Sequence, residues 1–243
     1  ITCKDISKPL TYDNGAVIEV NAAPGLRMHI YPTEGKTRNV AADILDLMFP
    51  AGKPSGVPII SITGTNGKTT VTRMIAHTLG LDGTVTGMAS TGGIYVGSEC
   101  TLKGDNTGPV SARRILRDTR VEVAVLETAR GGLIRHGLGY DLADVGVLIN
   151  IGDDHLGIDG INTMQELAKV KSLVIEAIKP GGTAVLNADD KMTPWLLNRV
   201  CCNSLLFSSR FGNLLLQKEI NEGNRVVYVR DGSIYTLLNN TET

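Results

Sequence analysis

Short apolar runs alternate with helix-length segments over most of the chain. The apolar runs are rich in β-branched residues and occupy 57–62, 84–90, 121–127, 144–151 and 183–187. Short runs of this composition are typical of parallel strands that are buried on both faces. The helix-length segments between them occupy 69–80, 109–118 and 163–178. This alternation predicts βαβ units with right-handed crossovers, and therefore an α/β fold built on a doubly wound, mostly parallel sheet.

Proline and glycine mark where these elements begin and end. Pro109 can occupy the first turn of a helix, and Gly80 can end one. The run Pro180-Gly181-Gly182 is expected to stop the helix that precedes it. Near the end of the chain, residues 225–238 predict a β-hairpin that turns at Asp231-Gly232.

The first 50 residues have a different texture and end in a helical pattern over 39–49. Residues 50–58 then concentrate Pro, Gly and Ser, which disfavour regular structure and mark a linker. We therefore divide the chain into an N-terminal part over 1–50, a linker over 51–58 and a main domain over 59–243. The chain starts with Ile-Thr-Cys rather than Met, from which we expect it to be a segment of a longer protein.

Composition excludes several functional classes. With 24 Lys and Arg against 25 Asp and Glu, the net charge is -1, so no bulk field favours nucleic acid or an anionic membrane. The four cysteines lack the spacing of a zinc site or a disulfide framework, and no apolar run approaches the roughly 20 residues that span a bilayer. We therefore expect a cytoplasmic protein in which any anionic ligand is held by a local site.

The strongest local signal is the phosphate-loop (P-loop) pattern ITGTNGKTT at 62–70, which lies between a predicted strand and a predicted helix. Its glycines let backbone N–H groups approach phosphate oxygens, and the helix N-terminus adds positive potential. Lys68 is expected to reach the β- and γ-phosphates, and the Thr69 hydroxyl to hold Mg²⁺. Ile62 stands where the general pattern has its first glycine. The expected nucleotide-binding residues are Gly64, Thr65, Asn66, Gly67, Lys68, Thr69 and Thr70.

This loop resembles the phosphate loop of the Mur ligases and folylpolyglutamate synthetases, in which that first glycine is ordinarily absent. The resemblance implies a P-loop-containing central domain that uses ATP and Mg²⁺ to form an amide through an acyl phosphate. Glu127 ends an apolar strand pattern in LETARGGL and resembles the family's Mg²⁺-binding glutamate. The segment NIGDDHLG resembles the family's Asn-x-x-x-Asp-His motif. By that resemblance His155 contributes to a second metal site, which Asp154 and Asn150 help to orient.

Many Mur-type ligases also use a carbamylated lysine, for which Lys169 and Lys171 are both candidates. Its distance from His155 favours Lys169, whereas the apolar residues at +3 and +4 favour Lys171, and the choice stays open. The resemblance also places Asn187 and Asp190, in NADD, on the adenine side of the nucleotide. It places four residues of the segments 90–93 and 104–109 near the substrate: Ser90, Thr91, Asn106 and Thr107.

Segments outside the loop resemble the cyanophycin synthetases more closely than the ligases of peptidoglycan synthesis. These segments are VSARRILRD, LETARGGLIRHGLGYD and GIDGINTMQELAKVKSLV. In addition, 15–29 resembles the last strand and metal loop of an ATP-grasp domain, in which Glu19 and Asn21 would bind Mg²⁺ of a second ATP. In that family an ATP-grasp site adds Asp to the polymer backbone, and a Mur-type site attaches Arg to the Asp β-carboxylate.

The resemblance therefore implies Arg, Asp and the growing cyanophycin chain as substrates, and we expect the full-length parent to be a homo-oligomer. The chain ends before the C-terminal domain that closes over ATP in Mur ligases. We expect it to bind Mg·ATP weakly and to ligate nothing by itself. Two alternatives remain. One is a folylpolyglutamate or peptidoglycan ligase, and the other is a catalytically silent module for ATP binding or assembly.

Overall fold

The computed structural model describes residues 1–5, 7–11, 14–52, 55–154, 156–238 and 241–242. The chain divides into two compact units, Ile1–Ser55 and Gly56–Thr243. In the first unit, a short antiparallel pair is formed by β1 (Thr2–Cys3) and β2 (Gly15–Ala16). Two helices follow, α1 (Arg27–Ile30) and α2 (Val40–Met48), so the helix predicted over 39–49 is confirmed. The assignment of this unit to an ATP-grasp domain stays a prediction.

The second unit is built on an eleven-stranded sheet, counted over the described residues, in the order β13-β12-β11-β10-β9-β8-β3-β7-β4-β5-β6. Its strands are β3 (Ile59–Thr63), β4 (Thr86–Ser90), β5 (Gly93–Val96), β6 (Glu99–Lys103), β7 (Val123–Glu127), β8 (Ala143–Leu148), β9 (Ile178–Asn187), β10 (Asn203–Ser208), β11 (Arg225–Arg230), β12 (Ser233–Leu238) and β13 (Thr241–Glu242). The strands from β11 to β4 pair in parallel, and antiparallel strands flank them at both edges. The predicted mostly parallel sheet is confirmed.

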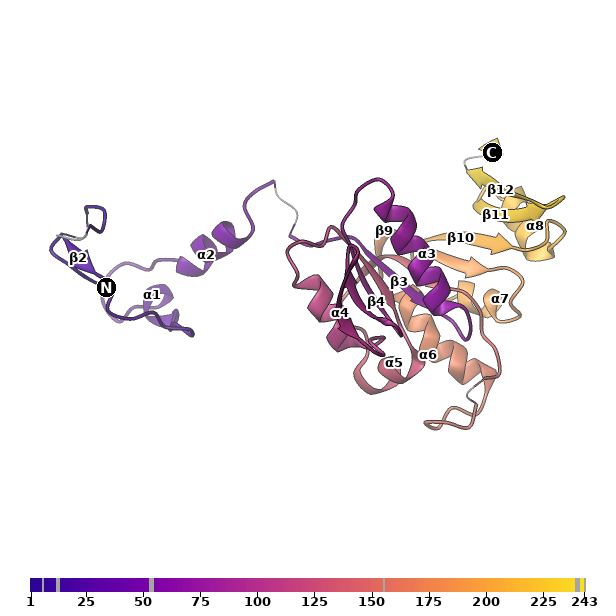
Figure 1. The fold of residues 1–243 in the computed structure, drawn as a ribbon, viewed down its shortest axis with the longest axis horizontal. Helices are drawn as coiled ribbons and strands as arrows, with labels where there is room; N and C mark the ends of the chain where they lie inside the picture. Colours follow the sequence, from indigo (N-terminus) through magenta and orange to yellow (C-terminus); the bar gives the residue numbers. More distant parts are fainter. Residues whose placement is uncertain (6, 12–13, 53–54, 155, 239–240, 243) are drawn as a thin grey trace. The chain divides into compact units, whose positions relative to one another are not determined.

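Helices cover both faces of this sheet (Figure 1). They are α3 (Lys68–Gly80), α4 (Pro109–Leu116), α5 (Arg130–His136), α6 (Met164–Glu176), α7 (Thr193–Leu197) and α8 (Leu214–Asn221). On one face, α3 packs on Ile62, Val125 and Val147. On the other face, α4 packs on β4 and β7, and α6 packs on β8 and β9. Because side chains alternate along a strand, the central strands β3, β4, β7 and β8 contribute to the cores on both faces, which is the doubly wound arrangement.

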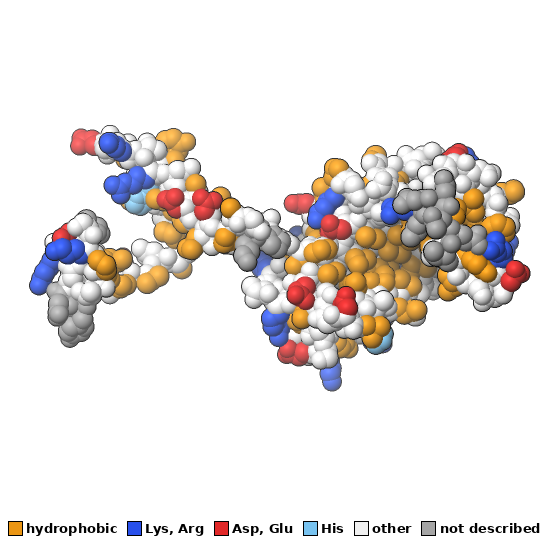
Figure 2. Space-filling model, turned by 90° about the horizontal axis from the view of Figure 1, so that it is seen from above, with side chains coloured by type: hydrophobic (Ala, Val, Ile, Leu, Met, Phe, Trp, Pro, Cys, Tyr) orange, Lys and Arg blue, Asp and Glu red, His pale blue; other side chains and the backbone are white. Residues whose placement is uncertain are grey.

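Some apolar side chains of the second unit reach its surface. Figure 2 shows them gathered in the middle of one side of this unit, between charged side chains. On the α3 face of the sheet, Val145, Ile149 and Val185 are only half-buried. Parallel sheets are normally covered on both faces, so the described residues cover this face incompletely. Among the helices of the described residues, none is long and apolar enough to cross a membrane.

The predicted hairpin is confirmed, whereas the predicted helix stop is wrong. β11 and β12 pair antiparallel across Asp231 (φ 52°) and Gly232 (φ 78°), and two left-handed residues in succession are typical of a type I′ turn. Helix α6 ends earlier than expected, with Ala177 as its C-cap. Pro180-Gly181-Gly182 instead lies inside β9, where the ladder to β8 is irregular. Proline and glycine are tolerated there because regular pairing is already interrupted.

Helix α6 packs closely against Gly146 of β8. A Cβ atom at this position would overlap the carbonyl oxygen of Val174 and lie 2.9 Å from Ile178 Cδ1. We expect Gly146→Ala to lower the free energy of unfolding by about 2–3 kcal/mol, because the backbone must shift to admit the methyl group. Urea titration followed by the fluorescence of Trp195, the single tryptophan, measures this effect. Gly80→Ala is the control because its Cβ would meet no atom within 4 Å. Equal stability of the two variants would contradict the packing described.

Candidate active site

The loop between β3 and α3 presents backbone N–H groups at the N-terminus of a helix of 13 residues. Gly67 is the N-cap of this helix and has a left-handed φ of 82°, a backbone conformation that residues other than glycine rarely adopt. Gly64 is constrained by space instead, since a Cβ there would lie 3.1 Å from Ile149 Cβ. Lys68 donates from Nζ to the Thr65 carbonyl at 2.9 Å. A helix N-terminus with a neighbouring lysine is a site for an anion such as a phosphate.

The segment after β8 braces this loop. Asn150 Oδ1 accepts from the backbone N–H groups of Thr65 and Asn66, both at 2.9 Å, and Asn150 Nδ2 donates to the Asn66 carbonyl at 3.2 Å. The Thr65 hydroxyl accepts from Gly152 N at 2.8 Å, and Asp154 accepts from Asn66 Nδ2 at 3.2 Å. Asn150 and Asp154 therefore contact the loop directly. His155 lies outside the described residues.

Glu127 stands at the end of β7, beside the loop, and only 3% of it is exposed. Its Oε1 accepts from the hydroxyls of Thr69 and Thr91, each at 3.0 Å, and its Oε2 accepts from Thr91 N at 2.9 Å. All the side-chain atoms that meet here are oxygens, which are the ligands that Mg²⁺ prefers. The residues present therefore fit a magnesium ion held by Thr69 and Glu127. The predicted ligands Glu19 and Asn21 are exposed residues of the first unit.

The two candidate lysines lie in different surroundings. Lys171 is buried, and its Nζ donates to the Gly64 carbonyl at 2.6 Å. Burial, together with the positive charges of Lys68 and Arg130, lowers the pKa of Lys171 to about 7. Lys169 is exposed on the same helix. The structure therefore brings Lys171 to the phosphate loop and leaves Lys169 at the surface.

Among the predicted substrate residues, the threonines face the open site. Thr91 and Thr107 line a hollow together with the loop residues 65–70, Asp105 and Glu127. Ser90 and Asn106 are buried behind it. The Ser90 hydroxyl donates to the Gly93 carbonyl at 3.3 Å, and Asn106 bonds to Gly104 and Ser111. These two residues therefore support the surrounding turns.

A second hollow is bordered by Asn150, which hydrogen-bonds to Thr65 and Asn66 of the first. Asn187, Asp190, Met164 and Met192 line it. Asp190 Oδ2 accepts from Ile151 N at 2.5 Å, which ties the turn after β9 to the end of β8. Its lining is mostly polar, because Asn150, Asp153, Asp189 and Lys191 also border it and Ile151 is its one further apolar residue. The predicted adenine-side residues Asn187 and Asp190 therefore share one hollow beside the phosphate loop.

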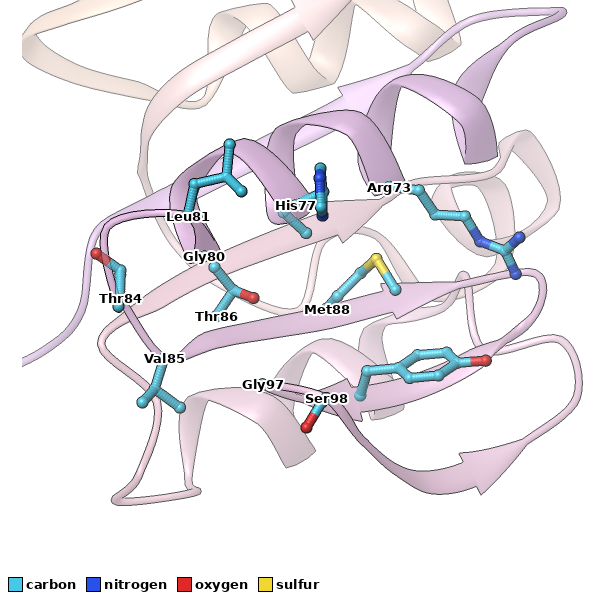
Figure 3. A pocket seen from close by; sticks show the side chains of 13 residues that line it. Arg73, His77, Gly80, Leu81, Thr84, Val85, Thr86, Met88, Gly97 and Ser98 are labelled. Carbon is cyan, nitrogen blue, oxygen red and sulfur yellow. The ribbon is translucent and has the colours of Figure 1, made fainter.

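A larger hollow lies elsewhere, between α3 and the strands β4 and β5 (Figure 3). Arg73, His77, Met88 and Tyr95 contribute to its lining. None of the predicted site residues lines it. It also lacks the helix N-terminus and the buried carboxylate that border the hollow at the phosphate loop.

Arg130 and Asp189 are two neighbours of the site that the sequence did not indicate. Arg130 donates to Asp159 Oδ2 at 3.0 Å and to the Ile158 carbonyl at 3.2 Å, which anchors the segment that carries Asp154. Its position in LETARGGL, three residues after Glu127, was the available signal. Asp189 lies between Asn187 and Asp190 and bonds to a distant loop, for which the local sequence carries no signal.

A family model supplies the deciding comparison, because the model for the Mur ligase middle domain matches residues 62–238. The chain belongs to the Mur ligase middle-domain family. This match spans the phosphate loop, the three hollows described above and nearly all of the sheet. The family assignment agrees with the strand order and with the place of the loop at the end of β3.

Named relatives of this Mur-type chain agree with the resemblance seen in its sequence. It is 49% identical over 237 residues to "Cyanophycin synthetase" of Synechocystis sp., which covers 98% of this chain and 27% of the relative. The predicted resemblance to the cyanophycin synthetases is therefore confirmed. The chain spans about a quarter of the length of these relatives.

Two solved structures share the fold of the second unit. A UDP-N-acetylmuramoyl-L-alanyl-D-glutamate--2,6-diaminopimelate ligase aligns with a TM-score of 0.59 at 20% identity, over 83% of this chain and 40% of its own. E. coli FolC in complex with DHPP and ADP aligns with a TM-score of 0.54 at 17% identity, over 83% of this chain and 50% of its own. At these identities the likeness concerns the fold alone.

Proposed function

We propose that this chain is the ATP-binding core of an ATP-dependent amide ligase. The observation that carries the proposal is the meeting of Thr69, Thr91 and the buried Glu127 carboxylate beside the Gly67 turn. A buried carboxylate bonded only by hydroxyl and N–H donors is suited to a metal that neutralises phosphate charge. The E. coli FolC structure, solved with ADP, supports ATP as the nucleotide.

In this proposal, each residue of the site has a separate task. Backbone N–H groups of the loop and Lys68 hold the triphosphate, and Thr69 and Glu127 hold Mg²⁺, which would stabilise charge on the transferred phosphoryl group. Asn150 keeps the loop rigid through its three hydrogen bonds. The ATP γ-phosphoryl group passes to a substrate carboxylate, and an amine then displaces phosphate from the acyl phosphate. Positioning and electrostatics supply most of the acceleration.

Lys171, rather than Lys169, is the lysine that we propose to be carbamylated. A neutral amine is needed to attack CO₂, and a lysine whose pKa is about 7 is largely neutral at slightly alkaline pH. Attack forms a bond between Nζ and the carbon of CO₂, releases one proton and leaves a carboxylate on the side chain. The Lys171 amine that would carry this carboxylate lies at the phosphate loop, where it donates to the Gly64 carbonyl. Lys169 has no such neighbour because it is exposed.

For the full-length protein, we propose cyanophycin synthesis. The Mur-type site would attach Arg to the β-carboxylate of Asp. An ATP-grasp site, to which Glu19 and Asn21 would belong, would add Asp to the backbone. The similarity to the Synechocystis sp. relative, which extends through the first unit, supports this choice over a folylpolyglutamate or peptidoglycan ligase.

Titration with Mg²⁺ and a non-hydrolysable ATP analogue tests the proposal. We expect Lys68→Ala to weaken binding by about ten-fold or more, because a charge-assisted contact to phosphate is lost. Lys169→Ala is the matched control, since it removes an exposed lysine at a distance from the loop. Equal affinity of wild type and Lys68→Ala would argue for a silent module without a phosphate site.

A further inference from the structure

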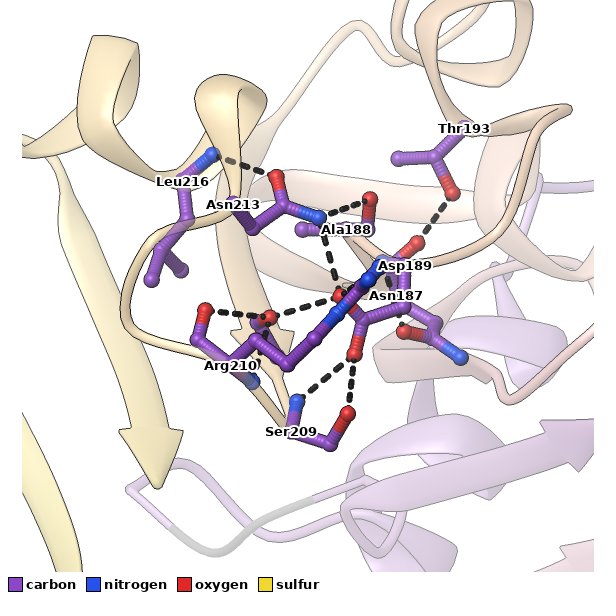
Figure 4. Close-up of polar contacts among 9 residues, drawn as sticks. Asn187, Ala188, Asp189, Thr193, Ser209, Arg210, Asn213 and Leu216 are labelled. Carbon is purple, nitrogen blue, oxygen red and sulfur yellow. Dashed lines mark hydrogen bonds and ion pairs between the residues drawn. The ribbon is translucent and has the colours of Figure 1, made fainter. Parts of the chain in front are cut away.

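Asp189 ties the turn after β9 to the segment that leads from β10 into α8 (Figure 4). Its Oδ1 accepts from the Ser208 hydroxyl at 2.8 Å and from Asn213 Nδ2 at 2.9 Å. Its Oδ2 accepts from the backbone N–H and the hydroxyl of Ser209, both at 2.7 Å. Arg210 lies 3.4 Å from Oδ1. One carboxylate therefore joins two segments that are about twenty residues apart in the sequence.

The same turn is held at two further points, both on the backbone of Ala188. Ala188 N donates to the Phe207 carbonyl at 2.8 Å, and the Ala188 carbonyl accepts from Asn213 Nδ2 at 2.9 Å. Asn213 is also the N-cap of α8, where its Oδ1 accepts from Leu216 N at 3.1 Å. We call Asp189 and the groups that donate to it, on Ser208, Ser209 and Asn213, the Asp189 clamp. This clamp is anchored at the start of a helix and the end of a strand, both of which are rigid elements of the fold.

What the clamp controls is the Asn187 amide. Asp189 N donates to Asn187 Oδ1 at 2.9 Å, which fixes the orientation of that amide group. The Asn187 side chain borders the hollow that adjoins the phosphate loop. Its Nδ2 atom then remains available as a donor. An asparagine amide held in one orientation matches the acceptor and donor edge of adenine.

The protonation state of Asp189 agrees with this arrangement. Burial alone would raise the pKa of Asp189, but hydrogen bonds from Ser209, Ser208 and Asn213 together hold it well below its ordinary value. The side chain is therefore a carboxylate at neutral pH. It can accept from every donor that surrounds it.

We propose that Asp189, which borders the same hollow as Asn187, is a positioning residue for the nucleotide base and acts by holding Asn187 in place. This inference rests on the proposed function, in which ATP lies against the phosphate loop. In this proposal two parts of the protein bind two parts of one ligand. The loop at Gly67 binds the triphosphate, and the turn that Asp189 holds binds the base. Loss of the clamp should therefore weaken recognition of the base and spare the phosphates.

Two probes distinguish these parts, namely the Mg²⁺ complex of a non-hydrolysable ATP analogue and that of inorganic tripolyphosphate. We expect Asp189→Asn to weaken binding of the ATP analogue about ten-fold and to leave binding of tripolyphosphate unchanged. Asp82→Asn is the matched control, because Asp82 also accepts from a backbone N–H and a hydroxyl, within a loop outside the site. Unchanged tripolyphosphate binding also shows that the variant is folded.

Other outcomes overturn the inference. Unchanged affinity for the ATP analogue would show that the clamp does not position the base, and an equal loss for both probes would show a general structural role. Wild-type protein that binds neither probe would overturn the proposed function itself, a result distinct from both.

If Asp189→Asn does not fold, a second pair of variants tests the same inference. Ser209→Ala removes a single donor and should weaken binding of the ATP analogue only, whereas Ser209→Thr keeps the hydroxyl and should bind the analogue like the wild type. Equal affinities of these two variants would contradict the clamp.

Discussion

Replacing Lys171 with methionine is expected to stabilise the second unit at pH 6 and to remove most of its pH dependence between about pH 7 and pH 10. Burial, with the charges of Lys68 and Arg130, lowers the pKa of Lys171 from 10.5 to about 7. Across this window the unfolded chain therefore holds a proton that the folded chain has released. The free energy of unfolding of the wild type should therefore rise with pH through this window. Below pH 7 it should be at most about 5 kcal/mol lower than above pH 10.

The measurement is urea unfolding at several pH values in CO₂-free buffer, so that no carbamate forms on the lysine. Lys169→Met is the control, because Lys169 is exposed on the same helix and its loss should leave the wild-type profile unchanged. If Lys171→Met and Lys169→Met give the same pH profile, Lys171 is not the buried, neutral amine that the proposed carbamylation requires.

Glu127→Gln is expected to remove most of the dependence of nucleotide binding on magnesium. The variant keeps the size of the side chain and can still bond to Thr91, but it lacks the charge that a divalent cation needs. In titrations of the ATP analogue with and without Mg²⁺, we expect the wild type to gain about a hundred-fold in affinity from the ion and the variant only a few-fold. This difference is the largest that we expect at the site.

Glu122→Gln is the matched control for this experiment. Glu122 immediately precedes β7, at the opposite end from Glu127, where it accepts from Val85 N at 2.7 Å and is exposed. Its loss should leave the effect of magnesium at the wild-type value. A Glu127→Gln variant with wild-type magnesium dependence would remove Glu127 from the proposed metal site.

The interior of the sheet could be predicted from the sequence, but its edges could not. Strands such as β7 and β8 are mostly buried, so their apolar runs are visible without any knowledge of neighbours. β6 is mostly exposed and reads ECTLK, a pattern that gains its strand conformation only from pairing with β5. The end of α6 at Glu176 could likewise not be predicted from the sequence, because it depends on β9 starting at Ile178.

The site could be predicted where its residues follow a strand, and less well elsewhere. The order of the sheet places β3 between β7 and β8, which brings Glu127 and Asn150 to the two sides of the loop. The choice between the lysines was available in the helical period, because Lys171 shares a face with the other buried positions of α6. These positions are Leu167, Ala168, Ser172, Val174 and Ile175. Asp189 was out of reach, because its partners lie far along the chain.

The central claim is that a nucleotide triphosphate lies against the Gly67 turn. Backbone amide NMR shifts, recorded while Mg²⁺ and the ATP analogue are added, test it most directly. We predict that the largest shifts fall on residues 64–70, with smaller ones around Glu127 and Asn187. Shifts concentrated around Thr84 and Tyr95, in the hollow of Figure 3, with unchanged signals for Gly67 and Lys68, would contradict the account.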